Sequence, residues 1–543
     1  MKKIIRTTIK SFFYVLYYGI IALLLYFVVA GRTLTDWYDV TFGTRFREIV
    51  YTFNLGLTGA DTSFMSEALQ ECRPDLIKAT IIVLLLVTAD LILFRRVGLR
   101  KVRVDESKGR HDVQEETSRH ETKETKLKYR WVRSKWGVAL QGVYHATILL
   151  ICIFLAKPVY LYADQVLEVS DFLRSKLMYT NIYDEKYVDP ISVQIENTRK
   201  QKRNVIIIYM ESMETTYASK DLGGYQERNL MPNLYNLQRQ NIAFGDRKGM
   251  AGTHNPYGTT WTTASLLASS SGIPFAFNIG MNKNIGNDSD KGKFAKGVTT
   301  LGDILEKKGY NQEFICGSDS AFGRKKKLFQ EHGNYKIFDY YSAIDAGYID
   351  KDYKVWWGME DYRTYEAAKD EIRKLADKGK PFNCTLLTVD THHVGGYRCS
   401  KCPRGNGSKT ANVVACADQQ VQNFVDWCKM QDFYKNTTIV IVGDHPRMDK
   451  KLVEDVDKVN REAIDVFINS VSPYRKIDRK RTAVTMDFFP TILSSMGYSI
   501  EGERLGLGTN LFSKKKTLSE EMGYEAFNLE MGKNSRFYHE NFE

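Results

Sequence analysis

Three apolar stretches in the first third of the sequence constrain its fold more than any other feature. They cover residues 11–31, 76–94 and 136–163 of 543. Each supplies about the 20 residues that a helix needs to cross about 30 Å of hydrocarbon. A cleaved signal peptide is the alternative for the first stretch, but its apolar run is long and no clear small-residue cleavage site follows. We predict three membrane-spanning helices, at about residues 11–31, 76–94 and 137–160.

The basic segments of this region predict how the helices are oriented. The start, MKKIIRTTIK, and residues 95–135 are rich in Lys and Arg, and such segments stay in the cytoplasm. Residues 95–135 fit a linker that is disordered or bound to anionic lipid. The net charge of +12 is therefore partly a topology signal, and we expect no nucleic-acid partner. Residues 32–75 and everything after the third span are placed on the outer side.

The division of the chain follows from these helices. Residues 1–163 form a transmembrane region, and residues 164–203 form a connector. We expect the connector to be a helix along the membrane followed by an extended segment. Residues 204–543 form an extracytoplasmic domain, which is long enough to bury a core of its own.

Six of the eight cysteines fall in the exported part, where disulfides can persist. These are Cys316, Cys384, Cys399, Cys402, Cys416 and Cys428. The pair in CSKC resembles half of a zinc knuckle, but no second pair follows at a standard spacing. The sequence favours a disulfide role and leaves the pairing open.

Short apolar, β-branched runs in the exported domain are typical of buried strands. They cover residues 204–210, 311–316, 382–389 and 437–443. Residues 300–309 and 360–379 read as helices, and each ends in Gly, which is a common helix stop signal. Strands that alternate with helices predict an α/β domain with a mostly parallel central sheet.

Several of these strands are followed by acidic or histidine residues. Glu211 follows the first strand, the pair Asp444 and His445 follows the last, and the pair His392 and His393 follows residues 382–389. Ligands of parallel sheets gather at the carboxyl ends of the strands. Oxygen and nitrogen donors of this kind suit a divalent cation such as Mn²⁺ or Zn²⁺. The alternative for Glu211 is a cap or surface charge, and for the His pair one packing and one exposed residue.

The stretch YGTTWTTASLLASSSGIPF, which begins at Tyr257, crowds four threonines around Trp261. One interpretation is structural: a β-branched turn that enters a helix of small residues. The other is that one hydroxyl is a nucleophile, activated by a nearby base or metal ion.

The motifs, taken in chain order, resemble the sulfatase-like branch of the alkaline phosphatase superfamily. They are NVIIIYMESMETTY, LMPNLYNLQRQNIAFGD, GTTWTTASLLASSSGIP, LLTVDTHH, IVIVGDHP and TAVTMDFFPTILSSMG, which span roughly residues 200–515. Within that branch, the first part of the threonine stretch, VWWGMEDYRTYE and ERLGLGTNLFS are similar to membrane-anchored phosphoglycerol transferases of the glucan phosphoglycerol transferase and lipoteichoic acid synthase type. Lipoteichoic acid synthases typically have five spans, whereas this sequence supports three.

The resemblance implies roles for individual residues. Glu211, Thr262, Asp444 and His445 look like the metal shell, with Thr262 as nucleophile and Thr260 and Thr263 as its alternatives. His392 takes the place of the histidine that contacts the transferred phosphoryl group, and His393 is its substitute. Arg324 and Trp261 look like substrate-binding residues, although the spacing around Arg324 departs from the synthases. The C/S-x-P-x-R motif of sulfatases proper does not match here, which disfavours sulfate-ester hydrolysis.

The activity implied is the transfer of phosphoglycerol from phosphatidylglycerol to a glycan or polymer hydroxyl, through a covalent threonine intermediate. One divalent ion is expected, Mn²⁺ before Zn²⁺ or Mg²⁺, in a multi-pass protein of the bacterial inner (cytoplasmic) membrane with its catalytic domain on the periplasmic or extracellular side. The alternatives are a phosphoethanolamine transferase acting on lipid A or a glycan, and a non-catalytic membrane protein that binds lipid or glycan. The sequence leaves open the acceptor, the metal and the oligomeric state.

Overall fold

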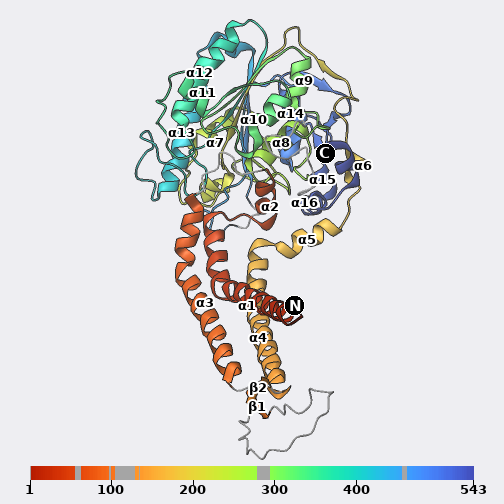
Figure 1. The fold of residues 1–543 in the computed structure, drawn as a ribbon. Coiled ribbons are helices and arrows are strands. Elements are labelled where there is room, and N and C mark those ends of the chain that lie inside the picture. Colours follow the sequence, from red (N-terminus) through yellow and green to blue (C-terminus); the bar gives the residue numbers. More distant parts are fainter. Residues whose placement is uncertain are drawn as a thin grey trace, which may run out of the picture. The chain divides into compact units, whose positions relative to one another are not determined.

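The chain forms two compact units. The computed structural model describes residues 2–55, 63–96, 99–103, 129–133, 135–277, 294–454, 456 and 461–543 (Figure 1). The first unit, the helical unit, joins Met1–Trp37 with Ser63–Val166. The second unit, the globular unit, joins Tyr38–Thr62 with Leu167–Glu543. Part of the segment between the first two apolar stretches therefore belongs to the globular unit.

The helical unit is built from long apolar helices. These are α1 (Lys2–Thr41), α3 (Ser63–Arg96) and α4 (Lys135–Leu167). The described part of the chain contains three helical segments long and apolar enough to cross a membrane: Ser11–Thr41, Phe64–Leu93 and Trp136–Leu167. This confirms the prediction of three apolar helices. The helices are longer than the apolar stretches because polar residues continue them, as residues 63–75 do at the start of α3.

A buried carboxylate joins two of these helices. Asp90 on α3 accepts a hydrogen bond of 2.9 Å from Gln141 of α4, and its second oxygen lies 3.1 Å from His145 Nε2. A charged group in an apolar helix is tolerated when it finds such partners inside the bundle. The interaction accounts for two polar interruptions of the apolar stretches.

The two ends of the basic segment pair with each other, which the sequence analysis did not predict. β1 (Leu99–Arg103) lies antiparallel to β2 (Tyr129–Arg133). Residues 104–128 between them lie outside the described residues, so the linker prediction for that part stays a prediction.

The globular unit is organised around one sheet, in which seven strands are described. Its order is β5-β10-β9-β4-β8-β6-β7. The strands are β4 (Asn204–Met210), β5 (Gly252–Thr253), β6 (Asn311–Cys316), β7 (Lys336–Phe338), β8 (Phe382–Leu387), β9 (Thr437–Gly443) and β10 (Ala463–Ile468). β4, β6, β7, β8 and β9 run parallel, whereas β10 is antiparallel to β9 and β5 is antiparallel to β10. The predicted α/β class with a mostly parallel sheet is confirmed.

Both faces of the sheet are buried, because side chains alternate along each strand. On β4, Val205, Ile207 and Tyr209 enter one hydrophobic core, and Ile206, Ile208 and Met210 enter the other. Residues of α8 (Thr262–Ser271), α9 (Leu301–Lys307) and α14 (Phe488–Ser495) complete the first core. Residues of α7 (Pro232–Gln240), α12 (Asp361–Asp377) and α13 (Lys409–Lys429) complete the second. The two groups of helices lie on opposite sides of the sheet in Figure 1.

Shorter elements surround this core. They are α2 (Phe46–Leu55), α5 (Val169–Leu177), α6 (Ile182–Lys186), β3 (Ile195–Asn197), α10 (Lys325–Glu331), α11 (Tyr340–Asp345), β11 (Tyr498–Ile500), β12 (Arg504–Leu505), β13 (Gly508–Thr509), α15 (Leu518–Met522), α16 (Tyr524–Gly532) and α17 (Arg536–Phe542). β3, in the segment predicted to be the connector, pairs antiparallel with β11. The end of that segment is therefore built into the globular unit.

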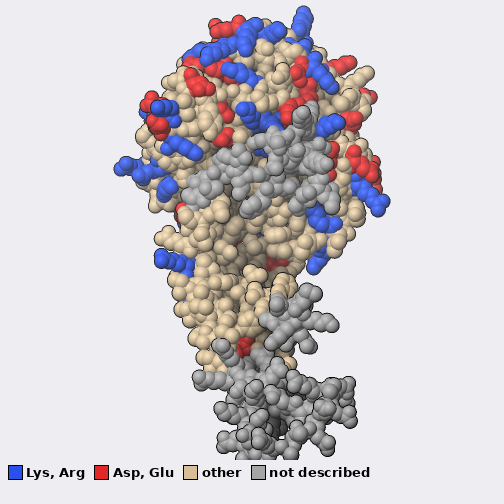
Figure 2. All heavy atoms as spheres, in the orientation of Figure 1, with Lys and Arg blue, Asp and Glu red and all other residues tan. Residues whose placement is uncertain are grey.

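The surfaces of the two units differ in charge. Basic and acidic side chains are interspersed over the visible face of the globular unit, whereas the visible face of the helical unit carries few (Figure 2). Large apolar side chains such as Phe12, Leu85 and Phe154 are more than half exposed on the helices. Such a surface suits lipid as its solvent.

Arg203 lies at the amino end of β4, so replacing it tests the stability of the sheet without changing residues at its carboxyl edge. It is 3% exposed, precedes β4, and donates to the carbonyl oxygens of Thr437, Asn469 and Lys435. Arg203→Met removes a donor from each of these carbonyls, although Thr437 keeps a bond from the Asn469 side chain. We therefore expect the free energy of unfolding to fall by about 1–3 kcal/mol. Thermal unfolding of the full chain in detergent measures the change. Arg199→Met, at an exposed position nearby, should unfold like wild type, and equal melting temperatures of the two variants would contradict this role.

Candidate functional site

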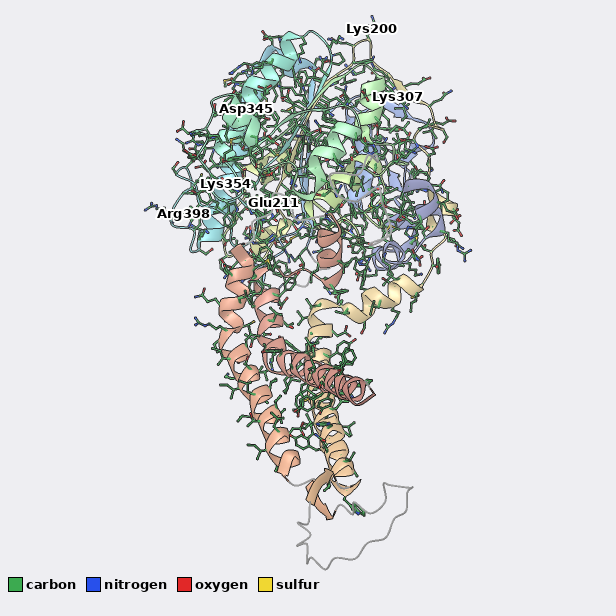
Figure 3. All side chains as sticks on the ribbon, in the orientation of Figure 1. Lys200, Glu211, Lys307, Asp345, Lys354 and Arg398 are labelled. Carbon is green, nitrogen blue, oxygen red and sulfur yellow. The ribbon has the colours of Figure 1, made fainter. Side chains whose placement is uncertain are left out.

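The parallel register of β4 and β9 brings two carboxylates together. Met210 lies opposite Gly443 in this register, so the next residues, Glu211 and Asp444, leave the sheet side by side. They are 2% and 0% exposed. Figure 3 shows Glu211 at the carboxyl end of the sheet, with Lys200 at the opposite end of the globular unit.

Local hydrogen bonds fix the direction of both side chains. Ser212 donates from its hydroxyl to Glu211 Oε1 at 2.7 Å and from its backbone N–H to Asp444 Oδ1 at 2.8 Å. The backbone N–H of His445 also donates to Asp444 Oδ1. As a result Glu211, Asp444 and His445 each offer one ligand atom, and these atoms lie within 4.8 Å of one another.

His445 presents the correct nitrogen for metal binding. Its Nδ1 lies 2.9 Å from the carbonyl oxygen of Pro446, so Nδ1 carries the proton and donates it. The lone pair is then on Nε2, which lies 3.3 Å from Asp444 Oδ2 and 3.7 Å from Glu211 Oε1. A backbone acceptor that sets the tautomer in this way is common for metal-ligating histidines.

Among the four threonines, all of which are described, Thr262 is the one whose hydroxyl faces this cluster. Thr262 Oγ1 lies 3.3 Å from Glu211 Oε2 and 3.4 Å from His445 Nε2. The other hydroxyls donate elsewhere: Thr259 to the carbonyl of Pro256, Thr260 to Glu48 and Thr263 to the carbonyl of Gly323. Thr262 is also the first residue of α8, so free backbone N–H groups of the helix start lie beside it.

The electrostatics of the cluster call for a cation. Burial, together with the negative charge of Glu211, raises the pKa of Asp444 to about 7. Burial lowers the pKa of His445, but the carboxylates of Asp444 and Glu211 outweigh it and raise the pKa overall. Asp444 Oδ2 is buried with no hydrogen-bond partner among the described residues. Two carboxylates, one imidazole nitrogen and one hydroxyl, with an orphaned carboxylate oxygen among them, fit a divalent cation.

The His pair lies in the loop after β8 and packs as a stack. The rings of His392 and His393 are 4.1 Å apart, and Trp357 contacts His392 at 4.7 Å. His392 Nδ1 bonds to the carbonyl of His393 at 2.7 Å, which leaves Nε2 for other partners. Burial raises the pKa of Glu211, but the nearby charges of His392 and His445 outweigh it and lower the pKa overall. His392 therefore belongs to the electrostatic surroundings of the cluster.

Two other predicted site residues have structural partners. Arg324 is 7% exposed and donates from Nε to the carbonyl of Leu55 at the end of α2. Trp261 is 6% exposed and stacks on Tyr51 of α2 at 5.5 Å, with Phe275 at the same distance on its edge. Both positions border the start of α8 from the side of α2, and their roles in substrate binding stay predictions.

Lys325 is a site residue that the sequence did not distinguish. It begins a run of three lysines, Lys325 to Lys327, which in the sequence suits either contact with anionic head groups or a solvated face. Its side chain is 4% exposed and donates to the carbonyl of Phe322. Burial lowers its pKa more than the negative charges of Glu211 and Asp444 raise it, so the pKa is lowered overall. Its positive charge also acts on His392. The sequence feature that indicates a turn just before Lys325 is AFG, in which Gly323 has a positive φ.

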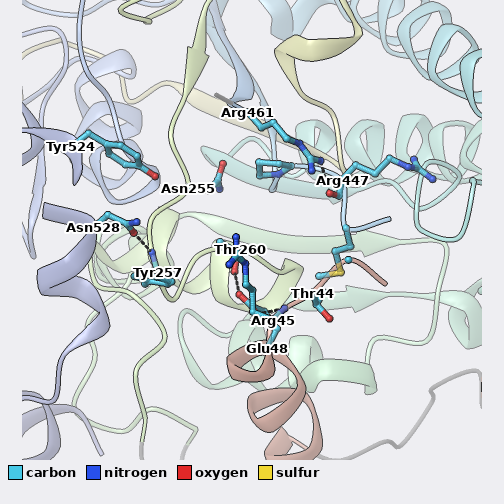
Figure 4. A pocket seen from close by; sticks show the side chains of 13 residues that line it. Thr44, Arg45, Glu48, Asn255, Tyr257, Thr260, Arg447, Arg461, Tyr524 and Asn528 are labelled. Atoms are coloured by element: carbon cyan, nitrogen blue, oxygen red, sulfur yellow. Dashed lines mark hydrogen bonds between the residues drawn. The ribbon is translucent and has the colours of Figure 1, made fainter. Parts of the chain in front are cut away.

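A small cavity of about 220 Å³ is lined in part by residues close in sequence to Thr262 and His445 (Figure 4). It is lined by Gly43, Thr44, Arg45, Glu48, Asn255, Tyr257, Thr260, Pro446, Arg447, Met448, Arg461, Tyr524 and Asn528. Thr260 and Pro446 are close sequence neighbours of Thr262 and His445, but neither Thr262 nor His445 lines the cavity. Its charged and amide side chains suit a small polar group.

Comparisons with known proteins identify the family of the chain. The Sulfatase family model matches residues 203–498. Phosphoglycerol transferase I of Xanthomonas euvesicatoria pv. vesicatoria (strain 85-10) is 29% identical over 323 residues, 58% of this chain and 43% of that protein. Phosphoglycerol transferase I of Salmonella choleraesuis (strain SC-B67) is 29% identical over 327 residues, 59% of this chain and 40% of that protein.

Among solved structures, a protein in the alkaline phosphatase superfamily from Vibrio parahaemolyticus has a TM-score of 0.47 and 20% identity, covering 63% of this chain and 78% of that one. The chain belongs to the sulfatase family, because the family model matches more than half of its length. This confirms the resemblance found in the sequence. The chain spans less than half the length of the two curated relatives.

Proton and metal binding at the cluster should compete, which gives a test. Folded Asp444 and His445 have raised pKa values, so the metal-free folded chain binds protons more tightly than the unfolded chain. The stability that they contribute is complete below their unfolded pKa values and is lost as the pH rises through the folded ones. Burial lowers the pKa values of His392 and His393, which acts in the opposite sense below about pH 6.5. We therefore expect the melting temperature of the metal-free protein to fall between about pH 6.5 and pH 8, and added Mn²⁺ to raise it more at pH 8.

Thermal unfolding at both pH values, with and without Mn²⁺, measures this effect. Asp444→Asn should respond less to pH and lose the Mn²⁺ shift. A Mn²⁺ shift in this variant as large as in wild type would place the cation elsewhere.

Proposed function

We propose that this protein transfers the phosphoglycerol group of a membrane phospholipid, phosphatidylglycerol, to a hydroxyl of a glycan or polymer. One observation carries the proposal: Thr262 is the described threonine whose hydroxyl faces the Glu211–His445 cluster, at 3.3 and 3.4 Å. The match to curated relatives named phosphoglycerol transferase I supports this choice of group. The three apolar helices support an integral membrane protein that meets its lipid donor in the bilayer.

The chemistry is a double displacement at phosphorus. Thr262 Oγ1 bonds to the phosphorus of the lipid, the bond to the diacylglycerol oxygen breaks, and protonated His392 donates its proton to that oxygen. The acceptor hydroxyl then gives its proton to neutral His392 and bonds to phosphorus, and the bond to Thr262 Oγ1 breaks. One proton is released to water in the first half and taken back in the second.

Glu211, Thr262, Asp444 and His445 would hold one divalent ion, with Mn²⁺ our first choice and Zn²⁺ or Mg²⁺ the alternatives. When bound, such an ion favours the ionised threonine and withdraws charge from the phosphoryl oxygens. The chain itself supplies two further aids. The N–H groups at the start of α8 face developing negative charge, and Lys325 adds a buried positive charge.

Two features of the surroundings suit the lipid head group. Trp357 packs against His392 and Phe322, at 4.7 and 5.3 Å, and forms an apolar wall beside the reacting groups. The cavity of about 220 Å³ lined by Thr260 and Asn255 matches a small polar group such as glycerol. We place the globular unit on the periplasmic or extracellular side of the bacterial cytoplasmic membrane, in accord with the basic segments.

The first test compares Thr262→Ala with Thr263→Ala. The wild-type chain, in detergent with Mn²⁺ and head-group-labelled phosphatidylglycerol, should release diacylglycerol and carry a phosphoglycerol adduct on the peptide that contains Thr262. Thr262→Ala should lose the adduct and reduce release by roughly 10³-fold or more, as expected when a nucleophile is removed. Thr263→Ala removes a hydroxyl that bonds to a backbone carbonyl and should keep the adduct.

The lipid donor is decided in the same assay. Release from phosphatidylethanolamine but not from phosphatidylglycerol would keep the threonine chemistry and make the protein a phosphoethanolamine transferase. If neither lipid releases diacylglycerol with Mn²⁺, Zn²⁺ or Mg²⁺, the transferase proposal is overturned in favour of lipid or glycan binding without catalysis.

Lys325→Met tests whether the buried lysine acts on the transferred group. Met keeps most of the side-chain volume, so the fold should persist while kcat/KM falls by about 10²-fold, the effect of losing one charged stabilising group. Lys326→Met, at an exposed neighbouring position, is the matched control. Steady-state kinetics on labelled phosphatidylglycerol measure both, and equal kcat/KM values would show that Lys325 has only a packing role.

A further inference from the structure

A second cluster of metal-binding side chains lies outside the site described above. Cys399 and Cys402 belong to the loop between β8 and α13, and Cys416 lies on α13. Cys399 Sγ is 3.6 Å from Cys402 Sγ and 3.9 Å from Cys416 Sγ, and the three sulfur atoms lie within 4.8 Å of one another. Cys399 and Cys416 are buried and Cys402 is partly exposed.

We infer that Cys399, Cys402 and Cys416 bind one Zn²⁺ ion as thiolates, and that this ion fastens the loop carrying His392 and His393 to α13. The sequence analysis favoured a disulfide because CSKC has no second pair at a standard spacing. The fold supplies the missing ligand from α13, where Cys416 lies one helical turn before Gln420.

The spacing of the sulfur atoms matches zinc rather than a disulfide. Zinc–thiolate bonds are about 2.3 Å long in tetrahedral sites, which puts ligand sulfur atoms about 3.8 Å apart. The separations of Cys399 Sγ from the other two sulfur atoms, 3.6 and 3.9 Å, lie on either side of that value. A disulfide requires about 2.05 Å, and a bond between any two of the cysteines would leave the third as an unpaired thiol. All eight cysteines of the chain are free thiols in the structure.

Gln420 offers a fourth ligand. Its side-chain nitrogen lies 3.1 Å from Cys416 Sγ and 3.9 Å from Cys399 Sγ, while its Oε1 is buried with no hydrogen-bond partner among the described residues. The residue is 9% exposed. The oxygen and nitrogen of a side-chain amide are assigned from their partners. Rotating the Gln420 amide by half a turn directs Oε1 at the ion, which then has three sulfur ligands and one oxygen ligand.

The location of the cluster gives the ion a positioning role. Residues 388–408, all described, contain no helix or strand, and loops above about 12–15 residues of this kind usually need a function or an added constraint. The loop start is held by Asp361, which accepts from the N–H groups of Val389 and Asp390. Gly396 donates to the carbonyl of His392 at 3.0 Å. Zinc at Cys399 and Cys402 fixes the loop again just beyond this contact.

The other exported cysteines serve as internal controls. Cys316, Cys384 and Cys428 are each buried, and none of them joins a group of metal-ligating side chains among the described residues. Cys428 lies on α13 as Cys416 does. Removing it changes a buried thiol of the same helix and leaves the three-cysteine cluster intact.

The decisive measurement is X-ray absorption at the zinc edge on the full chain, purified in detergent. The protein carries Asp444→Ala, which removes a ligand of the strand-end cluster, and sulfur neighbours distinguish the cysteines from a further group of oxygen and nitrogen donors, Asp246, His254 and Glu462. We expect about three sulfur neighbours at about 2.3 Å. Zinc with only oxygen and nitrogen neighbours, or no bound zinc, would overturn the inference. This readout does not depend on phosphoglycerol transfer.

Two variants then test the positioning role. Cys416→Ser should lose one zinc per chain and expose residues 388–408 to proteases at least about tenfold faster, because the loop opens locally. Cys428→Ser should keep the zinc and the wild-type cleavage rate. If Cys416→Ser does not fold, the absorption measurement still decides. Peptide mapping that finds a Cys399–Cys402 disulfide in most of the native protein would also reject the zinc site.

Discussion

The pairing of two parallel strands forces two carboxylates into the interior, and the rest of the site follows from that constraint. Glu211 and Asp444 leave β4 and β9 at the same level of the sheet, and neither is more than 2% exposed. At about 4 Å, like charges repel by about 4 kcal/mol with an effective dielectric of 20. A fold that holds both must gather positive charge around them, since an uncompensated buried charge is strongly destabilising.

That positive charge comes from three separate parts of the chain. His445 is adjacent to Asp444 in the sequence, His392 lies in the loop after β8, and Lys325 begins α10. A divalent ion would balance the two carboxylates, which leaves the charge of Lys325 as a surplus. His392 adds to this surplus only when it is protonated, since burial lowers its pKa. A phosphodiester carries one negative charge, so the arrangement that makes the buried acids tolerable also prepares the site for an anionic head group.

The sequence predicted those parts of the fold that depend on short segments. The runs 204–210, 311–316 and 437–443 match β4, β6 and β9 residue for residue, because strands buried on both faces are continuous apolar runs. β10 was not predicted, since its centre holds Asp465, a buried acid that accepts from Phe244 N–H and the Thr253 hydroxyl. Such a polar residue interrupts the pattern, and only the tertiary contacts explain it.

The residues of the candidate site also differ in whether the sequence alone indicates them. Residues placed directly by a strand end, such as Glu211 and Asp444, are visible in the sequence, because register alone brings them together. Lys325 and Cys416 are not, because each meets its partners through a turn or a helix from elsewhere in the chain. Gly443 illustrates how closely the strand ends are packed: a Cβ there would lie 2.0 Å from the carbonyl oxygen of Met213.

Functional side chains held by the sheet are positioned more precisely than those held by a loop. The carboxylates are held by the sheet itself, whereas His392 depends on a loop whose two ends are fixed by Asp361 and by the cysteine cluster. An error of about 1 Å in a reacting group can reduce a rate by about 10²-fold. The loop therefore needs firm anchors on both sides of His392. The carbonyl of Thr391 accepts from Arg447, and Gly395 donates to Asp449 and accepts from Thr410 of α13. The thiol cluster adds a further link between this loop and α13, beyond Gly395.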